Sequence, residues 1–483
     1  MIFWSFGRAI IVFSLILTLS LVPGEGDDCK GHISVIINQE GINFVKDVLI
    51  EKAISSMIPL QLPPIEGMKK IPLLGKVFIV LTNITINSVS FSSSQAEVKE
   101  RSGLLFLASG AVDEITMKWK YSYRNWLVEI TDSGDALVQV GGMELRIFVA
   151  LTEEEGTIKL TLIDCECSVQ NVYINLNGGA SWLYQAVADV FEKRIKIAVE
   201  NAISKKISQG ISKLDARLHK LPKRIPVGGV AILNATFVKD PVLSYSSIEL
   251  AIDGLFTSHA SLVDHANFSE KFHYSAFSNT AGKMLQLSLR EDVLNSAASA
   301  FYNTGHMHWT ITSLEDDSAA WGGVYPDLAL LYPSSDMVFN LSVASSPVLN
   351  VSSSSFDAVI ALSMVINVVA DEQALPVARI SLVAIEGLSP WISGNILRGS
   401  LEMRSFAASS EWSRVGDPNP QELEMIMSRI LKESVLPYVN GHLMEGIALP
   451  VPRGFAIREA QIGHSDSEVV VFCDVAEVLC YAM

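Results

Sequence analysis

The feature that most constrains this 483-residue chain is one long amphipathic segment set among strand-like sequence. It follows Gly178 and Gly179, begins at Ser181, whose side chain can cap a helix, and runs to Leu218. Its apolar residues recur mainly at steps of three and four, the spacing of one helix face: Leu183, Val187, Val190, Phe191, Ile195, Ala198, Ala202, Ile203, Ile207 and Ile211. A single long helix among strands needs a long, curved sheet to bury that face. The segment therefore predicts an elongated body with an apolar seam, a natural cavity for lipid.

Other amphipathic segments divide the chain into two similar halves. In the first half a helix is predicted over Glu40–Ile58, and strands follow it. The second half has a predicted helix over Glu291–Asn303, more strands, and a longer predicted helix over Gln421–Leu443, which Pro437 should kink or end. Each half thus combines antiparallel strands with two helices, and the later helix is the longer one.

The N-terminus has the pattern of a secretory signal peptide. Arg8 precedes the apolar run 9–22, so cleavage is predicted near Gly26, with a short signal anchor as the alternative. Five Asn-x-Ser/Thr sequons agree with secretion, and some of them should be unmodified: Asn83, Asn234, Asn267, Asn340 and Asn350. We therefore expect a secreted, extracellular glycoprotein. The predicted organisation is a signal peptide at 1–26, a first domain at 27–238, a linker at 239–250 and a second domain at 251–483.

Composition and motifs exclude several classes of function. The formal net charge of −16 argues against a protein that coats DNA or RNA, so no nucleic-acid partner is expected. No G-x-S-x-G elbow, H-E-x-x-H helix or P-loop occurs. We therefore expect no enzyme, no cofactor and no metal site.

Five cysteines are too few for a disulfide-based scaffold. Cys165 and Cys167 lie two apart on a predicted strand and face one side, with Cα atoms roughly 6.5 Å apart, near the upper limit for a disulfide. Residue count favours a pair between Cys473 and Cys480. Because five is odd, at least one thiol should lack a partner within the chain.

Basic residues gather between Lys69 and Arg124. This segment contains eight basic and four acidic residues, so its local net charge is +4, whereas the whole chain has a formal net charge of −16. Alternation along a strand places Lys118 and Lys120 on one face and Trp119 on the other. An anion-binding surface and an ordinary solvated strand face are both consistent with this pattern.

Seven stretches, in order, resemble the bactericidal/permeability-increasing protein and lipopolysaccharide-binding protein family, which includes cholesteryl ester and phospholipid transfer proteins. They are LGK at 74–76, MKWK at 117–120, CECS at 165–168, SWLYQ at 181–185, AFYNTG at 300–305, VLPYVN at 435–440 and GIALPVP at 446–452. The resemblance covers essentially the whole mature chain. It implies an α+β fold: an elongated boomerang of two domains, each a highly twisted antiparallel sheet wrapped on a long helix, joined by a central sheet. Each domain would hold an apolar tunnel for acyl chains.

The resemblance also implies site residues. It places Lys76, Lys118 and Lys120 at the tip of the first domain, where family members meet lipid A phosphates. The predicted head-group site adds the other basic residues of this cluster: Lys69, Lys70 and Arg124. The acyl-chain lining should come from the helix faces, although a filled core fits the same periodicity: Leu183, Val187, Val190, Phe191, Leu423, Ile426 and Ile430. The family's disulfide from the Cys165 region to the following helix has no partner here, because no cysteine lies between Ser168 and Leu218.

These observations together predict a secreted protein that binds lipopolysaccharide or related anionic amphiphiles in innate defence against bacteria. Its partners would be lipopolysaccharide, phospholipids and the bacterial outer-membrane surface; no receptor is indicated. A phospholipid or neutral-lipid transfer protein is the first rival, and the chain's acidity favours it because potent bactericidal members are cationic. A lipid hydrolase is the second rival, but the sequence lacks the motifs of such enzymes.

Overall fold

The computed structural model describes residues 31–71, 75–124, 129–177, 182–227, 231–258, 282–305, 307–311, 321–333, 335–370, 373–449, 451 and 454–478. These residues form two compact units. The first unit contains Ile37–Leu221 and Lys239–Glu249, and the second contains Pro222–Val238 and the chain from Leu250 onward. The domain limits and the linker at 239–250 stay a prediction.

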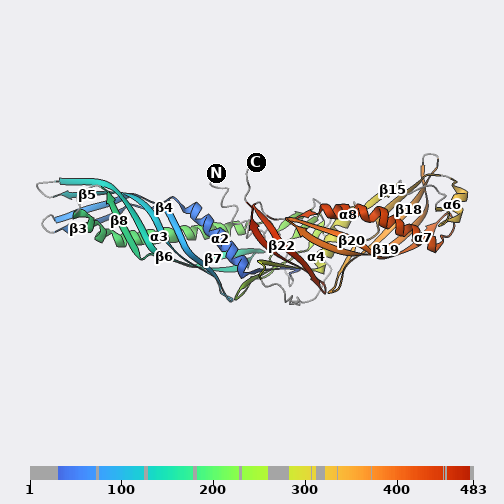
Figure 1. The fold of residues 1–483 in the computed structure, drawn as a ribbon, viewed down its shortest axis with the longest axis horizontal. Helices are drawn as coiled ribbons and strands as arrows, with labels where there is room; N and C mark the ends of the chain where they lie inside the picture. The colour runs from blue at the N-terminus through green and yellow to red at the C-terminus, as the bar shows by residue number, and fades with distance from the viewer. Residues whose placement is uncertain are drawn as a thin grey trace. The chain divides into compact units, whose positions relative to one another are not determined.

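The first unit is built on one seven-stranded antiparallel sheet (Figure 1). The order is β2-β4-β5-β6-β7, with β3 paired to β4 and β8 to β6. The strands are β2 (Leu60–Gln61), β3 (Ile65–Ile71), β4 (Gly75–Lys99), β5 (Gly103–Arg124), β6 (Glu129–Glu154), β7 (Thr157–Ser168) and β8 (Asn171–Asn177). Register shifts interrupt the β4–β5, β5–β6 and β6–β7 pairings. Such irregularities bend and twist strands of this length, which lets the sheet curve around a helix.

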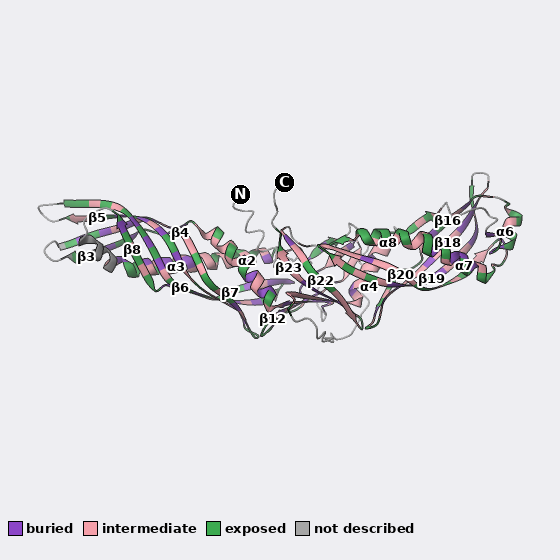
Figure 2. Cartoon of the chain, in the orientation of Figure 1, coloured by how far each residue is buried: buried purple, intermediate pink, exposed green. Residues whose placement is uncertain are grey.

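Two helices pack on this sheet: α2 (Gln39–Met57) against β4, and α3 (Trp182–Leu218) against β3, β7 and β8 (Figure 1). The predicted apolar face of α3 is the buried one, since Phe191, Ile195 and Val199 are fully buried. Strand residues alternate between this core and solvent, as the banding in Figure 2 shows. At Gly67 of β3 an added Cβ would lie 2.7 Å from Phe191 Cζ, so α3 rests directly on that strand.

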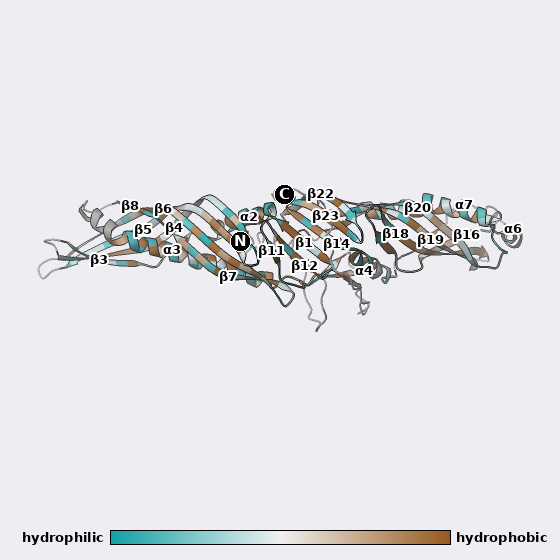
Figure 3. Ribbon diagram, turned by 90° about the horizontal axis from the view of Figure 1, so that it is seen from below, coloured by the Kyte–Doolittle hydropathy of each residue, from teal (hydrophilic) through white to brown (hydrophobic). Residues whose placement is uncertain are grey.

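Three sheets make up the rest of the described structure. Their orders are β11-β12-β1-β14-β23-β22, β13-β10-β9, and β15-β16-β18-β19-β20-β21 with β17 paired to β18. Apolar residues run along β1, β14 and β23 (Figure 3). The strands are β1 (Ile33–Asn38), β9 (Arg224–Val227), β10 (Ala231–Asn234), β11 (Val242–Ser244), β12 (Ser247–Ile252), β13 (Phe256–Ser258), β14 (Leu285–Arg290), β15 (His308–Ile311), β16 (Met337–Val343), β17 (Val348–Val351), β18 (Phe356–Ala370), β19 (Gln373–Ser393), β20 (Ile396–Ser413), β21 (Ile447–Ala448), β22 (Phe455–Ser465) and β23 (Glu468–Glu477).

Helices of the second unit are α4 (Glu291–Tyr302), α6 (Pro326–Leu331), α7 (Pro420–Ile430), the π-helical η1 (Leu431–Val435) and α8 (Leu436–Glu445). The Asn419 side chain caps α7 by accepting a 3.1 Å bond from Gln421 N. The chain stays helical past Pro437, since the π turn comes just before it. A proline removes one N–H donor and crowds the preceding turn, and a wider turn relieves both effects.

The predicted α+β fold of two units, each with antiparallel sheets and helices, is confirmed. The helix predicted over Glu40–Ile58 is observed as Gln39–Met57, and the one over Glu291–Asn303 as Glu291–Tyr302. The long helix ends at Leu218 as predicted, while its predicted cap, Ser181, lies outside the described residues. No helix among the described residues is long and apolar enough to cross a membrane.

One buried carboxylate interrupts the apolar face of β19. Glu386 is 3% exposed, and no described group forms a hydrogen bond with its Oε2 atom. Burial raises the pKa of Glu386 to about 7. In the unfolded chain a glutamate titrates near 4.3, so the folded state binds the proton more tightly between roughly pH 4.3 and 7. Stability therefore falls as pH rises through that window and is level above it.

We expect Glu386→Gln to stabilise the protein at about pH 8 by about 2 kcal/mol and to leave stability unchanged near pH 4, because the neutral amide avoids burying a charge. Chemical denaturation at both pH values measures this difference. Glu402→Gln, an exposed change on the neighbouring strand, is the control. An equal stability difference at the two pH values would show that Glu386 does not titrate inside the fold.

Candidate functional site

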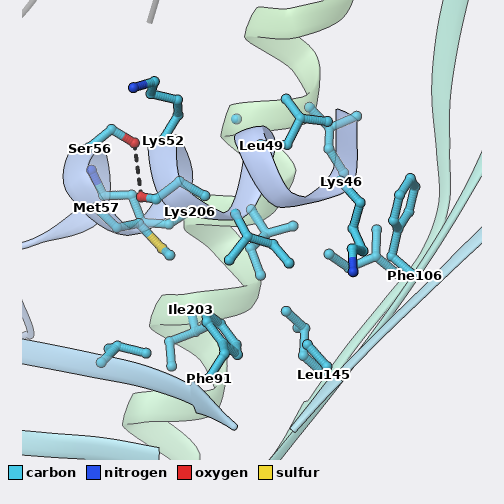
Figure 4. Close-up of a pocket in the computed structure, with 18 of the residues that line it drawn as sticks. Lys46, Leu49, Lys52, Ser56, Met57, Phe91, Phe106, Leu145, Ile203 and Lys206 are labelled. Atoms are coloured by element: carbon cyan, nitrogen blue, oxygen red, sulfur yellow. Dashed lines mark hydrogen bonds between the residues drawn. The ribbon is translucent and has the colours of Figure 1, made fainter. Parts of the chain in front are cut away.

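The first unit encloses a cavity of about 260 Å³ between α2, α3 and the inner face of the sheet (Figure 4). Strands β4 to β7 supply one wall, and the two helices supply the other. The apolar lining residues are Leu49, Ile50, Ala53, Met57, Ile58, Leu60, Ile86, Val89, Phe91, Leu104, Phe106, Leu107, Ala108, Met143, Leu145, Ile147, Val149, Leu160, Ile203, Ile207, Ile211 and Leu214. A space with this lining suits a hydrocarbon chain, since each methylene removed from water contributes about 0.8 kcal/mol.

Among the residues that the structure describes, the charged ones that line the cavity are all lysines. Two come from α2, Lys46 and Lys52, and two from α3, Lys206 and Lys213. The uncharged polar lining residues are Ser56, Gln95 and Gln209, and Gly210 also borders the cavity. The polar part of the cavity is therefore basic, in a chain whose formal net charge is −16.

The two α2 lysines differ in their surroundings. Lys46 is buried, and its Nζ donates to Ser94 O at 3.1 Å and lies 2.9 Å from Asp47 Oδ1. Figure 4 shows Lys46 extending toward Phe106, whereas Lys52 points away from the apolar lining. The charge of Lys46 is thus compensated inside the protein, and its stem adds to the apolar wall.

Gly210 leaves part of the α3 wall open. A Cβ built at this position meets no atom within 4 Å beyond the helix's own backbone. A glycine within a helix costs roughly 1 kcal/mol relative to alanine, and nothing in the packing requires one here. Its missing side chain leaves space beside the cavity.

Among the described residues, none of those predicted to line an acyl-chain pocket borders this cavity, and their role stays a prediction. Val190 and Phe191 pack in the core of the first unit, and Leu423, Ile426 and Ile430 lie in the core of the second. The side chains of Leu183 and Val187 lie outside the described residues. The described cavity adjoins a later part of the same helix face, at Ile203, Ile207 and Ile211. The apolar periodicity predicted which face of α3 is buried. The position of the cavity along that face is indicated in the sequence only by Gly210 and the lysines on either side of it.

The structure places most of the predicted head-group residues on one outward face of the first sheet. Lys70, Lys76, Lys118, Lys120 and Arg124 are exposed, while the half-buried Lys69 alternates to the other side of β3. Along each strand these exposed basic residues alternate with buried core residues, such as Ile79 on β4 and Trp119 on β5. Their role as head-group ligands stays a prediction.

Acidic residues on β6 partly neutralise this face. Lys118 Nζ lies 3.5 Å from Asp135 Oδ1, and Arg124 Nε lies 3.8 Å from Glu129 Oε2. Lys70 sits directly opposite Lys76, an arrangement of like charges that destabilises a strand pair. Among the described residues no carboxylate pairs with Lys70, Lys76 or Lys120.

Two apolar side chains share the same face. Met68 of β3 pairs with Phe78 of β4, and they are 49% and 52% exposed. The unpaired lysines flank them. This combination of exposed apolar and basic groups is the pattern of a surface that meets anionic lipid.

Cys165 and Cys167 are free thiols, and they are not joined to each other. Burial raises the pKa of Cys165, although a hydrogen bond with Ser204 opposes that effect. Burial, with a contribution from the Glu200 carboxylate, raises the pKa of Cys167 to about 12. Neither thiol is activated. Cys473 is also a buried free thiol, and Cys480, its predicted partner, lies outside the described residues.

The sequon asparagines differ in accessibility. Asn83, Asn340 and Asn350 are exposed, Asn234 is half-buried, and Asn267 lies outside the described residues. The Asn234 Oδ1 accepts a bond from Thr236 N within its own sequon. Glycosylation stays a prediction at all five positions.

A curved antiparallel sheet wrapped on a long helix, with an apolar cavity between them, defines a protein built to enclose lipid. The chain belongs to the LBP / BPI / CETP family: the N-terminal domain of that family matches residues 41–214 and its C-terminal domain matches residues 228–476. This is a family of lipid-binding and lipid-transfer proteins.

Relatives and a solved structure agree with this assignment. A BPI/LBP family protein of Arabidopsis thaliana is 38% identical over 476 residues, covering 97% of each chain. The bactericidal permeability-increasing protein of Sebastes schlegelii is 23% identical, covering 90% of this chain and 91% of its own. The crystal structure of lipopolysaccharide binding protein shares the fold, with a TM-score of 0.61 at 17% identity over 93% of this chain and 99% of its own.

The cavity predicts an unusual pair of effects for Gly210→Leu. The new side chain should occupy free space, so the amount of co-purified lipid should fall, while the free energy of unfolding of delipidated protein should rise by roughly 0.5–1 kcal/mol. Mass spectrometry of extracted lipid and denaturant titration measure the two effects. Gly210→Ala is the control, with similar helix stabilisation and little loss of space. If the Gly210→Leu variant carries as much lipid as the parent, the lipid does not bind in this cavity.

The cysteine environment predicts slow alkylation of Cys165 and Cys167 in native protein at about pH 8, because both pKa values are raised and little thiolate forms. After denaturation without reductant, both should react with iodoacetamide. Peptide mass spectrometry gives the extent of reaction at each position. A Cys165–Cys167 disulfide in the unreduced digest would contradict the free thiols.

Proposed function

We propose that this protein binds lipopolysaccharide or a related anionic amphiphile: the outward face of the first sheet docks on the surface of an anionic lipid assembly, and the cavity takes the acyl chain of one lipid molecule. The observation that carries the proposal is the apolar cavity between α2, α3 and the sheet. Hydrocarbon supplies most of the binding energy in such a site, and the charged face supplies selection.

The docking face is defined by three lysines and two apolar side chains: Lys70, Lys76, Lys120, Met68 and Phe78. Ammonium groups form charge-assisted hydrogen bonds with phosphate, which lipid A carries. An anion bound near Lys70 and Lys76 would offset the repulsion between these opposed lysines. The exposed Met68 and Phe78 would meet the apolar part of the same lipid surface.

The second candidate is a phospholipid or neutral-lipid transfer protein without endotoxin specificity. Two observations favour it: the formal net charge of −16 and the carboxylates of Asp135 and Glu129 beside two of the basic residues. A phospholipid transfer protein of Mus musculus is 22% identical over 93% of this chain. Binding selectivity at the docking face separates the two candidates.

Secretion and a role in innate defence against bacteria belong to the same proposal. The N-terminal signal pattern supports secretion. Relatives named bactericidal permeability-increasing protein and lipopolysaccharide-binding protein support the defensive role. We propose binding without catalysis, since the sequence carries none of the hydrolase motifs expected for lipid esters.

Changing Lys76 and Lys120 to Glu should weaken lipopolysaccharide binding by about a thousandfold, because two attractions of about 1 kcal/mol each are lost and two repulsions are added. Binding to phosphatidylcholine vesicles should stay the same. Both lysines lack a carboxylate partner among the described residues, so the change does not break an ion pair. Titration of parent and variant with purified lipopolysaccharide measures the loss.

Raising the salt concentration should weaken the parent more than the variant, since exposed charges are screened over about 10 Å at 0.1 M ionic strength. Lys193→Glu with Lys205→Glu, an exposed pair on α3 with the same charge change, is the control. Equal lipopolysaccharide affinity for parent and the Lys76/Lys120 variant would rule out this face and favour the transfer protein.

A further inference from the structure

The docking face and the cavity lie far apart along α3. Val190 and Phe191 contact β3, the strand that carries Lys70. Lys206 follows Val190 by 16 residues on the same helix, a rise of about 24 Å. A lipid whose chain fills the cavity therefore cannot place its own head group on the docking face. Its head group needs a second polar site near the cavity.

The lysines at the cavity supply such a site. Lys206 and Lys213 are seven residues apart on α3, which places them on the same side of the helix, with Gly210 between them. Neither has an ion pair or a side-chain hydrogen bond within the described structure. Lys52 on α2 has only a loose partner, with its Nζ 3.9 Å from Glu51 Oε1. Within the described part of the chain, no carboxylate lines the cavity.

The balance of charge decides which head group fits there. Lys46 is compensated by Asp47, so it adds little to recognition. Lys52, Lys206 and Lys213 keep most of their charge for a ligand. A zwitterionic head group would bring a cation among these lysines, whereas an anionic one brings only complementary charge. Gly210 leaves the backbone open between two of them, which allows the ligand to approach the helix closely.

We propose that Lys206 and Lys213 of α3, together with Lys52 of α2, form a site for an anionic head group, which selects amphiphiles with a phosphate or carboxylate head and an acyl chain in the cavity. This inference rests on the proposed lipid-binding function and narrows its ligand. It assigns the bound molecule's head group to the two helices, independently of the docking face.

The test is competitive loading of the full-length protein. Delipidated protein is incubated with vesicles of equimolar dioleoyl phosphatidylglycerol and phosphatidylcholine, or with phosphatidylcholine vesicles containing oleic acid, then re-isolated. Mass spectrometry of the extract gives the ratio of anionic to zwitterionic lipid. The parent should be enriched in anionic lipid, and Lys206→Gln with Lys213→Gln should lower that enrichment about tenfold, since each lysine near an anionic group raises affinity by up to about fivefold. The two arms separate phosphate from carboxylate heads.

The matched control is Lys193→Gln with Lys205→Gln, which removes the same charge from exposed positions on the same helix, and it should keep the parent's enrichment. Lys206→Arg with Lys213→Arg keeps both positive charges, so this variant should keep the parent's enrichment in anionic lipid. That result would show that the glutamine variant loses enrichment through lost charge and not through unfolding. Parent protein that takes up both lipids without enrichment in either arm overturns this inference while leaving the cavity as a lipid site. Unchanged enrichment in the double glutamine variant also overturns it. Parent protein that takes up no lipid overturns the proposed function as well.

Discussion

The first unit depends on one contact: the apolar face of α3 against the inner face of its sheet. A helix of 37 residues presents a face far longer than a short strand can cover, so the sheet needs strands of 22 to 26 residues. Strands of that length must twist and bend to follow a helix, and the register shifts between β4, β5 and β6 allow this. Gly67 marks the closest approach, where even a methyl group would collide with Phe191.

The cavity lies where this contact is incomplete. From Phe191 to Ile203 the helix fills the sheet's concavity, and the core there is closed. Beyond Ile203, α2 packs beside α3, and the side chains of the two helices and the strands leave a volume unfilled. Empty apolar volume costs stability, because its lining lacks contacts on one side. A hydrocarbon guest restores these contacts, so the same local flaw in packing that weakens the empty protein favours the loaded one.

The fold was largely predictable from the sequence, and the site was not. Steps of three and four defined α2, α3 and α4 closely, and alternation gave the strands, because both patterns follow from burying one face. Phe191 and Ile207 both belong to the apolar stripe predicted for this helix, yet one is in a closed core and the other lines the cavity. The difference depends on which partner element lies opposite, a tertiary fact that periodicity does not contain. The π turn before Pro437 likewise comes from local crowding that a pattern of apolar residues does not record.

Charge in this protein matters by location more than by total. A net charge of −16 predicts weak binding to anionic lipid. Among the described residues, however, no carboxylate lines the cavity, and none pairs with the three lysines of the docking face. Interactions between exposed charges fade beyond about 10 Å at moderate ionic strength. A phosphate at the cavity therefore responds to Lys206 and Lys213, and very little to carboxylates elsewhere on the chain. These two lysines lie on α3, the helix whose apolar face forms part of the cavity wall. The same helix therefore positions both the acyl chain and the head group of the bound lipid.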